Sequence, residues 1–152
     1  TALHTPGHLS NHLAFAMEDG AVFTGDLIMG WATTLVSPPD GDMAAFLASL
    51  AMMRQREDRV YYPGHGHPVE DTMGMVDHQI AHRKSRVDQI VAALGKGSAT
   101  PRGLTELIYT DVNPALHGAA ARNVFAALLG LAAEGRCAAQ GGLSPDAVFE
   151  LT

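Results

Sequence analysis

The chain has 152 residues, of which 47% are hydrophobic and 17% are charged, with a net charge of −6. This composition excludes an intrinsically disordered chain and a strongly basic nucleic-acid-binding protein, and the length suits one domain or two small ones. No apolar run is expected to span a bilayer, and a single cysteine, Cys137, excludes an internal disulfide and favours a cytoplasmic location.

In the first half, short apolar runs between turn residues predict strands at Ala2–Thr5, His12–Met17, Ala21–Thr24 and Val60–Tyr62. A helix is predicted after the rigid loop at 37–41, with Asp42 as its N-cap and Met43, Phe46, Leu47, Leu50 and Met53 on its apolar face. A second helix is predicted over Pro68–Leu94, with an apolar stripe formed by Val76, Ile80, Val87, Ile90, Val91 and Leu94. This alternation indicates an α/β layer architecture.

The pattern changes after the linker at 96–100. A short helix over Pro101–Tyr109 is predicted, with Thr100 as N-cap and with Leu104, Leu107 and Ile108 facing inward. Asn113-Pro114 begins another helix that ends near Gly135, with Val124, Leu128 and Leu131 spaced for burial. Two short strands, Arg136–Gln140 and Ala147–Leu151, flank a Gly-Gly turn. Together with the end of the long helix, this order is typical of a winged helix, so the predicted domains are 1–82 and 83–152.

Three motifs, TPGH, TGD and PGHG, place metal-capable side chains in glycine-containing turns at strand ends. They present His8, Asp26 and His65, which supply nitrogen, oxygen and nitrogen donors from one edge of the predicted sheet. Borderline metals such as zinc accept this combination of ligands. Their order and spacing therefore predict that the three side chains are metal ligands.

On LHTPGHLSNH, VFTGDLIMG and YYPGHGHP the chain resembles the metallo-β-lactamase-fold hydrolases. The long helix with His82-Arg83 and the winged-helix tail resemble the β-lactamase-like protein 2 type subgroup, some of whose members cleave single-stranded RNA. This resemblance implies an α/β fold in which the C-terminal half of an αββα sandwich precedes a small winged-helix domain. The family's other ligands come from a His-x-His-x-Asp-His motif, and no such string occurs in these residues.

The resemblance implies a hydrolase with two zinc ions, in which His8 binds the first ion, His65 binds the second and Asp26 bridges both. Asp26 is then also the catalytic residue, because it holds a metal-bridging hydroxide. The expected substrate is an ester, thioester, lactam or phosphodiester, so the expected partner is a small molecule or single-stranded RNA. No membrane partner is expected, and a homo-oligomer is left open. The alternative is a non-catalytic winged-helix module for protein interaction or nucleic-acid binding.

Several other residues keep two interpretations. His12 either contacts substrate or, as we favour, supports the metal ligands by hydrogen bonding. Trp31 either lines a substrate pocket or covers the core. His78 and His82 share a helix face, but the sequence between them lacks the glutamate of a helical zinc motif. The basic residues Arg83, Lys84 and Arg86 form either a solvated helix face, which we favour, or a contact with an RNA backbone.

Overall fold

The computed structural model describes all residues 1–152 and divides into two compact units, Thr1–His82 and Arg83–Thr152. The first unit contains a four-stranded sheet in the order β1-β2-β3-β4. Its strands are β1 (Ala2–His4), β2 (Leu13–Ala16), β3 (Ala21–Gly25) and β4 (Val60–Pro63). Strand β2 is antiparallel to both β1 and β3, whereas β4 runs parallel to β3. All four strands lie within one or two residues of the predicted ranges.

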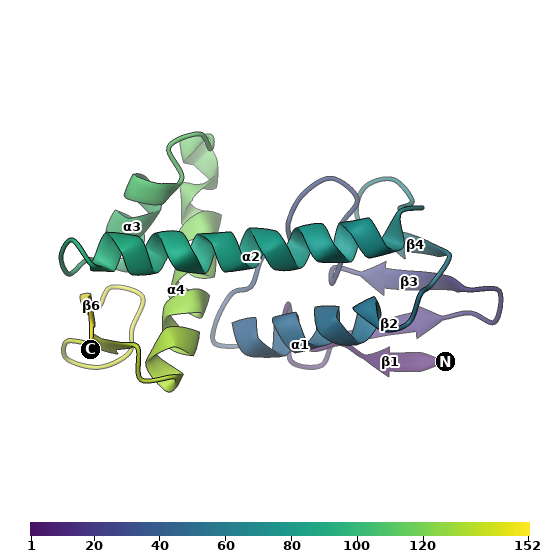
Figure 1. Cartoon of the computed structure of the whole chain (residues 1–152), viewed down its shortest axis with the longest axis horizontal. Coiled ribbons are helices and arrows are strands. Elements are labelled where there is room, and N and C mark those ends of the chain that lie inside the picture. The colour runs from purple at the N-terminus through teal and green to yellow at the C-terminus, as the bar shows by residue number, and fades with distance from the viewer. The chain divides into compact units, whose positions relative to one another are not determined.

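Helix α1 (Met43–Arg54) and the first half of α2 (Thr72–Leu94) cover one face of the sheet (Figure 1). The Asp42 carboxylate caps α1 by accepting a hydrogen bond from Ala45 N–H at 2.7 Å, as predicted. The core between helices and sheet consists mainly of Ala14, Val22, Phe46, Leu50, Met53, Tyr61 and Val76. On α1, Leu47 is only half-buried, and Ser49 is buried instead because its hydroxyl donates to Pro6 O at 2.7 Å.

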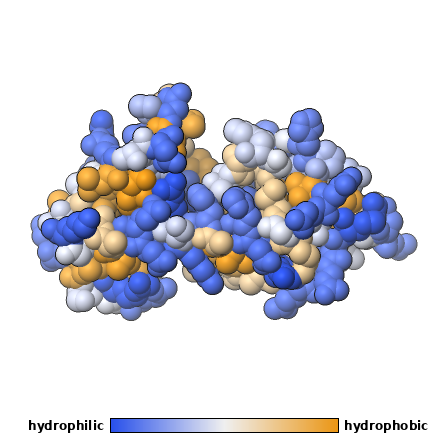
Figure 2. Space-filling model, turned by 45° about the horizontal axis from the view of Figure 1, so that its top comes forward, coloured by the Kyte–Doolittle hydropathy of each residue, from blue (hydrophilic) through white to orange (hydrophobic).

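The opposite face of the sheet is exposed and apolar. Alternation along β2 to β4 turns every second side chain to this face, and its large members are Leu13, Phe15, Phe23 and Tyr62, each between 38% and 50% exposed. The Phe23 and Tyr62 rings stack with 5.5 Å between centroids. Figure 2 shows that hydrophobic residues are exposed in separate patches on the side of the molecule that it draws. The sheet is thus a layer with one uncovered apolar side.

Helix α2 begins at Thr72, four residues later than predicted. Val69 is held in an extended bridge with Tyr61, and the Asp71 carboxylate accepts a hydrogen bond from Gly74 N–H at 2.9 Å. Asp71 therefore caps the helix, and Pro68 lies in the preceding loop. The buried face of α2 also differs from the predicted apolar stripe. Gln79 is buried with 1% exposure, whereas Ile80, which belongs to the predicted stripe, is only half-buried.

The second unit contains the end of α2, α3 (Pro101–Ile108), the short η1 (Pro114–Leu116), α4 (His117–Ala133) and the hairpin of β5 (Cys137–Ala139) and β6 (Phe149–Leu151). Its core includes Ile90, Leu104, Val124, Leu128 and Phe149. Thr100 caps α3 as predicted. Leu107, however, is 67% exposed, so its predicted inward position is wrong. Residues 101–108 form a two-turn helix whose single buried face is already occupied by Leu104 and Thr105.

One segment corrects the expectation about apolar runs. Pro114–Ala133 is long and apolar enough to cross a membrane when judged by length and composition alone, with a mean hydropathy of 1.3. In the structure 39% of the apolar stretch within this segment is buried. Its residues Val124, Leu128 and Leu131 belong to the core of the second unit. Core helices of folded domains pass the same test, and this segment forms part of the winged helix.

Candidate metal centre

The loops that follow β1, β3 and β4 bring His8, Asp26 and His65 together, and the sequence predicted that these side chains lie at one edge of the sheet. Asp26 Oδ2 lies 3.6 Å from His8 Nε2, and Asp26 Oδ1 lies 3.6 Å from His65 Nε2. Each carboxylate oxygen therefore faces a different imidazole. Both separations are longer than a hydrogen bond but lie within the range of about 4 Å that defines an ion pair.

The tautomer of His8 suits metal binding. Its Nδ1 donates to the backbone carbonyl of Leu35 at 2.7 Å, which places the proton on Nδ1 and leaves a lone pair on Nε2. The Nε2 atom is the one that faces Asp26. A backbone carbonyl behind a histidine in this way orients the ring and raises its strength as a ligand.

Asp26 is held through its backbone. Its N–H donates to His12 Nε2 at 3.2 Å, and its carbonyl accepts from the Thr34 hydroxyl at 2.8 Å. His12 in turn makes a 2.8 Å hydrogen bond between Nδ1 and the hydroxyl of the buried Thr5. Burial lowers the pKa of His12, and the neighbouring His8 lowers it further. His12 therefore acts as a neutral support behind Asp26, which is the role favoured from the sequence.

Glycines in the three motifs permit these close approaches. A Cβ on Gly64 would lie 2.9 Å from Asp26 Oδ1, and one on Gly25 would lie 2.7 Å from His12 Nε2. At Gly7 a Cβ would lie 2.3 Å from the Phe46 Cα. The motif pattern explained these glycines only by turn formation, whereas the structure shows that they also make room for the site's side chains and for α1.

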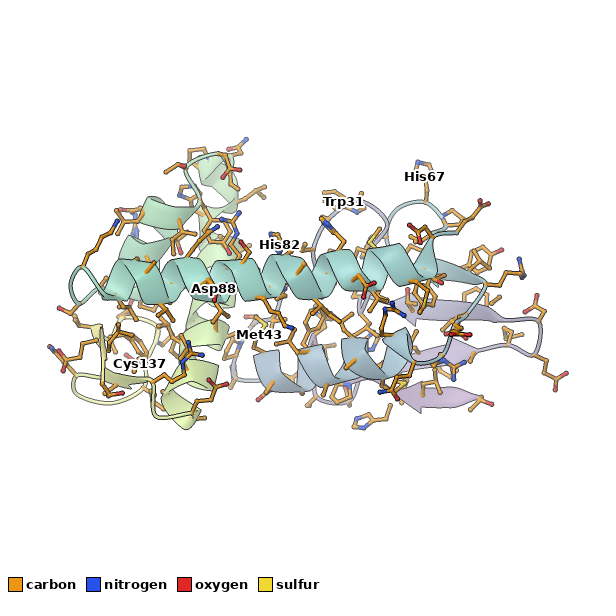
Figure 3. The ribbon with its side chains drawn as sticks, viewed as in Figure 1. Trp31, Met43, His67, His82, Asp88 and Cys137 are labelled. Carbon is orange, nitrogen blue, oxygen red and sulfur yellow. The ribbon has the colours of Figure 1, made fainter.

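The His65 loop is less enclosed. The His65 side chain is 65% exposed, compared with 23% for His8 and 32% for Asp26. Backbone hydrogen bonds connect this loop to the one after β3, from Gly64 N–H to Gly25 O at 2.9 Å and from Gly30 N–H to His65 O at 3.0 Å. His67 projects outward from the same loop (Figure 3), in agreement with its exposure.

The chemical types of these donors suit a metal ion, but there are too few donor side chains to hold one. It offers two imidazole nitrogens and one carboxylate, the ligand types that zinc and similar ions accept. No group of three or more His, Cys, Asp or Glu side chains lies close enough together to hold a metal ion. His8, Asp26 and His65 therefore do not by themselves form a metal-binding group.

The remaining residues of interest lie outside this cluster. His78 and His82 have ring centroids 6.4 Å apart on α2, and no third donor joins them. Arg83 is 3% exposed, and burial lowers its pKa to about 10. Arg86 stacks its guanidinium over the Tyr109 ring at 4.0 Å and donates to Ile108 O. Cys137 is buried in the second unit, and its Sγ donates to Leu128 O.

Residues 100–143 match the family described as "Beta-lactamase associated winged helix domain". The chain is similar to the Beta-lactamase-like protein 2 homolog of Drosophila melanogaster, with 30% identity over 88% of this chain and 46% of the relative. It is also similar to an atrochrysone carboxyl ACP thioesterase of Aspergillus chevalieri, with 31% identity over 81% of this chain and 39% of the relative. The chain thus spans less than half the length of these relatives.

Two solved structures share the fold. A metallo-beta-lactamase family protein from Thermus thermophilus has a TM-score of 0.85 and 26% identity, covering 99% of this chain and 48% of that one. A beta-lactamase domain protein from Burkholderia ambifaria has a TM-score of 0.87 and 20% identity, covering 99% of this chain and 46% of that one. Both similarities extend over the sheet, the helices and the winged helix.

Proposed function

Because this chain belongs to the metallo-β-lactamase superfamily and carries the winged helix associated with it, we propose that it is part of a metal-dependent hydrolase. One observation carries the proposal: the two oxygens of Asp26 face His8 Nε2 and His65 Nε2 at the same distance of 3.6 Å. A carboxylate placed between two imidazoles suits a ligand shared by two metal ions. We assign His8, Asp26 and His65 as metal ligands and Asp26 as the catalytic residue.

When bound, a pair of metal ions would lower the pKa of water toward neutrality and stabilise the negative charge that develops during hydrolysis. Zinc is the proposed metal, since nitrogen and carboxylate donors suit it. Within this chain, Leu35 O fixes the proton of His8 on Nδ1, and His12 and Thr34 hold the backbone of Asp26. These contacts orient the ligands before any metal binds.

We place the missing ligands outside these residues, on a second layer that covers the apolar face of the sheet. Phe15, Phe23 and Tyr62 on that face have the size and apolar character of an αββα interior and are exposed in this chain. An exposed apolar sheet face of this kind marks a surface that another element covers. This arrangement explains why the chain alone presents only part of a ligand set.

A thioester is the substrate class that we favour, because several relatives carry thioesterase names. The alternative of a winged helix that binds nucleic acid has less support. Of its candidate basic residues, Arg83 is buried and Arg86 is engaged with Tyr109 and Ile108, which leaves Lys84 as the exposed cation of the cluster. Phosphate binding generally uses several exposed cations together.

The test is to purify the intact gene product, measure its metal content by elemental analysis, and assay hydrolysis of acyl thioesters. Asp26→Asn should lose bound metal and thioester hydrolysis together while the circular dichroism spectrum stays unchanged. Asp77→Asn is the matched control, because Asp77 is an exposed carboxylate that pairs with Arg54 on the helical side. If Asp26→Asn keeps both its metal and its rate, the proposed centre is wrong.

A further inference from the structure

A single loop, residues 30–35 between β3 and α1, contacts all three residues of the proposed metal centre. Each contact is a hydrogen bond: Gly30 N–H donates to His65 O at 3.0 Å, the Thr34 hydroxyl donates to Asp26 O at 2.8 Å, and Leu35 O accepts from His8 Nδ1 at 2.7 Å. The three site residues are far apart in the sequence, so this loop links them to one another.

Thr34 makes a buried contact with two carbonyls. The residue is 0% exposed, and its hydroxyl donates to Asp26 O at 2.8 Å and to Leu27 O at 3.1 Å. Strand β3 ends at Gly25, so both carbonyls lie beyond the ladder in which backbone N–H groups pair with carbonyls. A buried carbonyl needs a donor, and a threonine hydroxyl supplies one without a further strand. The Thr34 hydroxyl therefore fixes the backbone of Asp26.

The residue after Thr34 fixes the tautomer of His8. Leu35 O accepts from His8 Nδ1, and the Leu35 backbone lies between Thr34 and Val36, which are both fully buried. A displacement of Thr34 would move the Leu35 carbonyl as well, because adjacent residues are about 3.8 Å apart along the chain. An imidazole without a fixed acceptor populates both neutral tautomers. The place of Thr34 thus decides whether His8 Nε2 carries a lone pair.

From these contacts we propose that Thr34 is a positioning residue for two site residues at once. Its hydroxyl holds the backbone of Asp26, and its place in the loop holds the Leu35 carbonyl that selects the Nδ1–H tautomer of His8. Thr34 acts only through these neighbours and contacts no reacting group. Its importance for metal binding rests on the proposed function, whereas its control of the tautomer does not.

The first experiment reads the tautomer of His8 in the metal-free intact gene product. The ¹⁵N chemical shifts of an imidazole distinguish Nδ1–H from Nε2–H, and at about pH 9 the histidine side chains are neutral. The His8 signals are those that disappear in His8→Gln. We expect the Nδ1–H tautomer alone in the wild type and a mixture in Thr34→Val, which keeps the side-chain shape without the donor. Thr34→Ser keeps the hydroxyl and should restore the single tautomer.

The second experiment titrates the same proteins with zinc. Thr34→Val should bind zinc about 10–100-fold more weakly, which is the usual loss when a contact that orients a metal ligand is removed. Thr34→Ser should recover most of that affinity. Thr72→Val is the matched control, because Thr72 is buried in the same unit and its hydroxyl donates to Asp58 O at 2.6 Å. It loses the same kind of hydrogen bond but should keep the His8 tautomer and zinc affinity of the wild type.

Thr34→Cys carries the comparison if Thr34→Val does not fold, because a thiol is a weaker donor of similar size. It should show a second tautomer of His8 where Thr34→Ser shows none. A single Nδ1–H tautomer in Thr34→Val, or in Thr34→Cys where that variant replaces it, overturns the proposal, and so does a mixture in Thr72→Val. If the wild type binds no zinc, the proposed metal centre is wrong, and the tautomer experiment still decides the role of Thr34.

Discussion

The backbone N–H of Asp26 donates to Nε2 of His12 across 3.2 Å, so a histidine outside the proposed ligand set holds the residue that faces His8 and His65. The histidine is fixed in turn by the buried hydroxyl of Thr5. His12→Ala should lower the free energy of unfolding by about 1–3 kcal/mol, because the Asp26 N–H loses its acceptor. It should also weaken metal binding by the intact protein about 10–100-fold, as loss of a supporting contact does.

His12→Gln is the discriminating variant, because its side-chain oxygen can still accept from Asp26 N–H. It should recover much of the lost stability and metal affinity, measured by denaturant unfolding and metal titration. His4→Ala serves as the control, since exposed His4 bonds only to Ser10 O. Equal metal affinity in wild type and His12→Ala would show that Asp26 needs no such support.

Gly7 provides a second prediction. It has φ of 136°, and a Cβ there would lie 2.3 Å from Phe46 Cα, so Gly7→Ala strains the backbone and displaces α1. We expect a loss of at least about 2 kcal/mol of unfolding free energy. The same substitution at Gly130, in α4 with no atom within 4 Å of its Cβ, should instead stabilise by about 0.5–1 kcal/mol. Urea unfolding measures both, and equal effects would contradict the packing of the TPGH turn on α1.

Phe23 tests whether the apolar sheet face is covered in the intact protein. If a second layer covers it, Phe23→Ala should cost about 3–5 kcal/mol of unfolding free energy, as for a buried phenylalanine. Leu143→Ala is the control, because Leu143 is 59% exposed in the second unit and should change stability by no more than about 0.5 kcal/mol. An effect of Phe23→Ala as small as the control's would mean that the face stays in water.

Tyr61 gives a pH-dependent prediction. Burial raises the pKa of Tyr61 to about 12, and the neighbouring Asp58 contributes to the rise. The unfolded chain ionises this phenol near its ordinary pKa of about 10, so the native state keeps a proton that the unfolded state releases. Stability from this group is therefore complete below a pH of about 10 and falls as the pH rises from about 10 toward 12.

Tyr61→Phe should remove this loss of folding stability at alkaline pH. The Tyr61 hydroxyl is buried without a hydrogen-bond partner, so its removal should leave stability at pH 7 unchanged or raise it by up to about 1 kcal/mol. Urea midpoints of both proteins at pH 7 and pH 11 make the comparison. A large loss of stability in Tyr61→Phe at pH 7 would show that the hydroxyl has a partner.

Local patterns predicted most of the elements correctly, and the errors have identifiable causes. The predicted fold class and family are confirmed by the similar structures and the winged-helix match. Helix α2 starts late because Val69 pairs with Tyr61, and the spacing of apolar residues does not reveal such a strand pairing. Leu107 is exposed because α3 has one narrow buried face, and three-residue spacing alone does not show which side that is. The roles of His8, Asp26 and His65 as metal ligands stay predictions.

What the sequence determined by itself was the order of strands, turns and helices and the three glycine-containing turns at strand ends. Those features depend on backbone preferences and on the spacing of apolar residues, which act over a few positions. Only the tertiary structure decided that Asp26 lies between two imidazoles, that His12 supports it and that Gln79 is buried at a cavity beside Trp31. These relationships join residues up to about fifty positions apart, so they arise from packing between elements, which local sequence preferences do not encode.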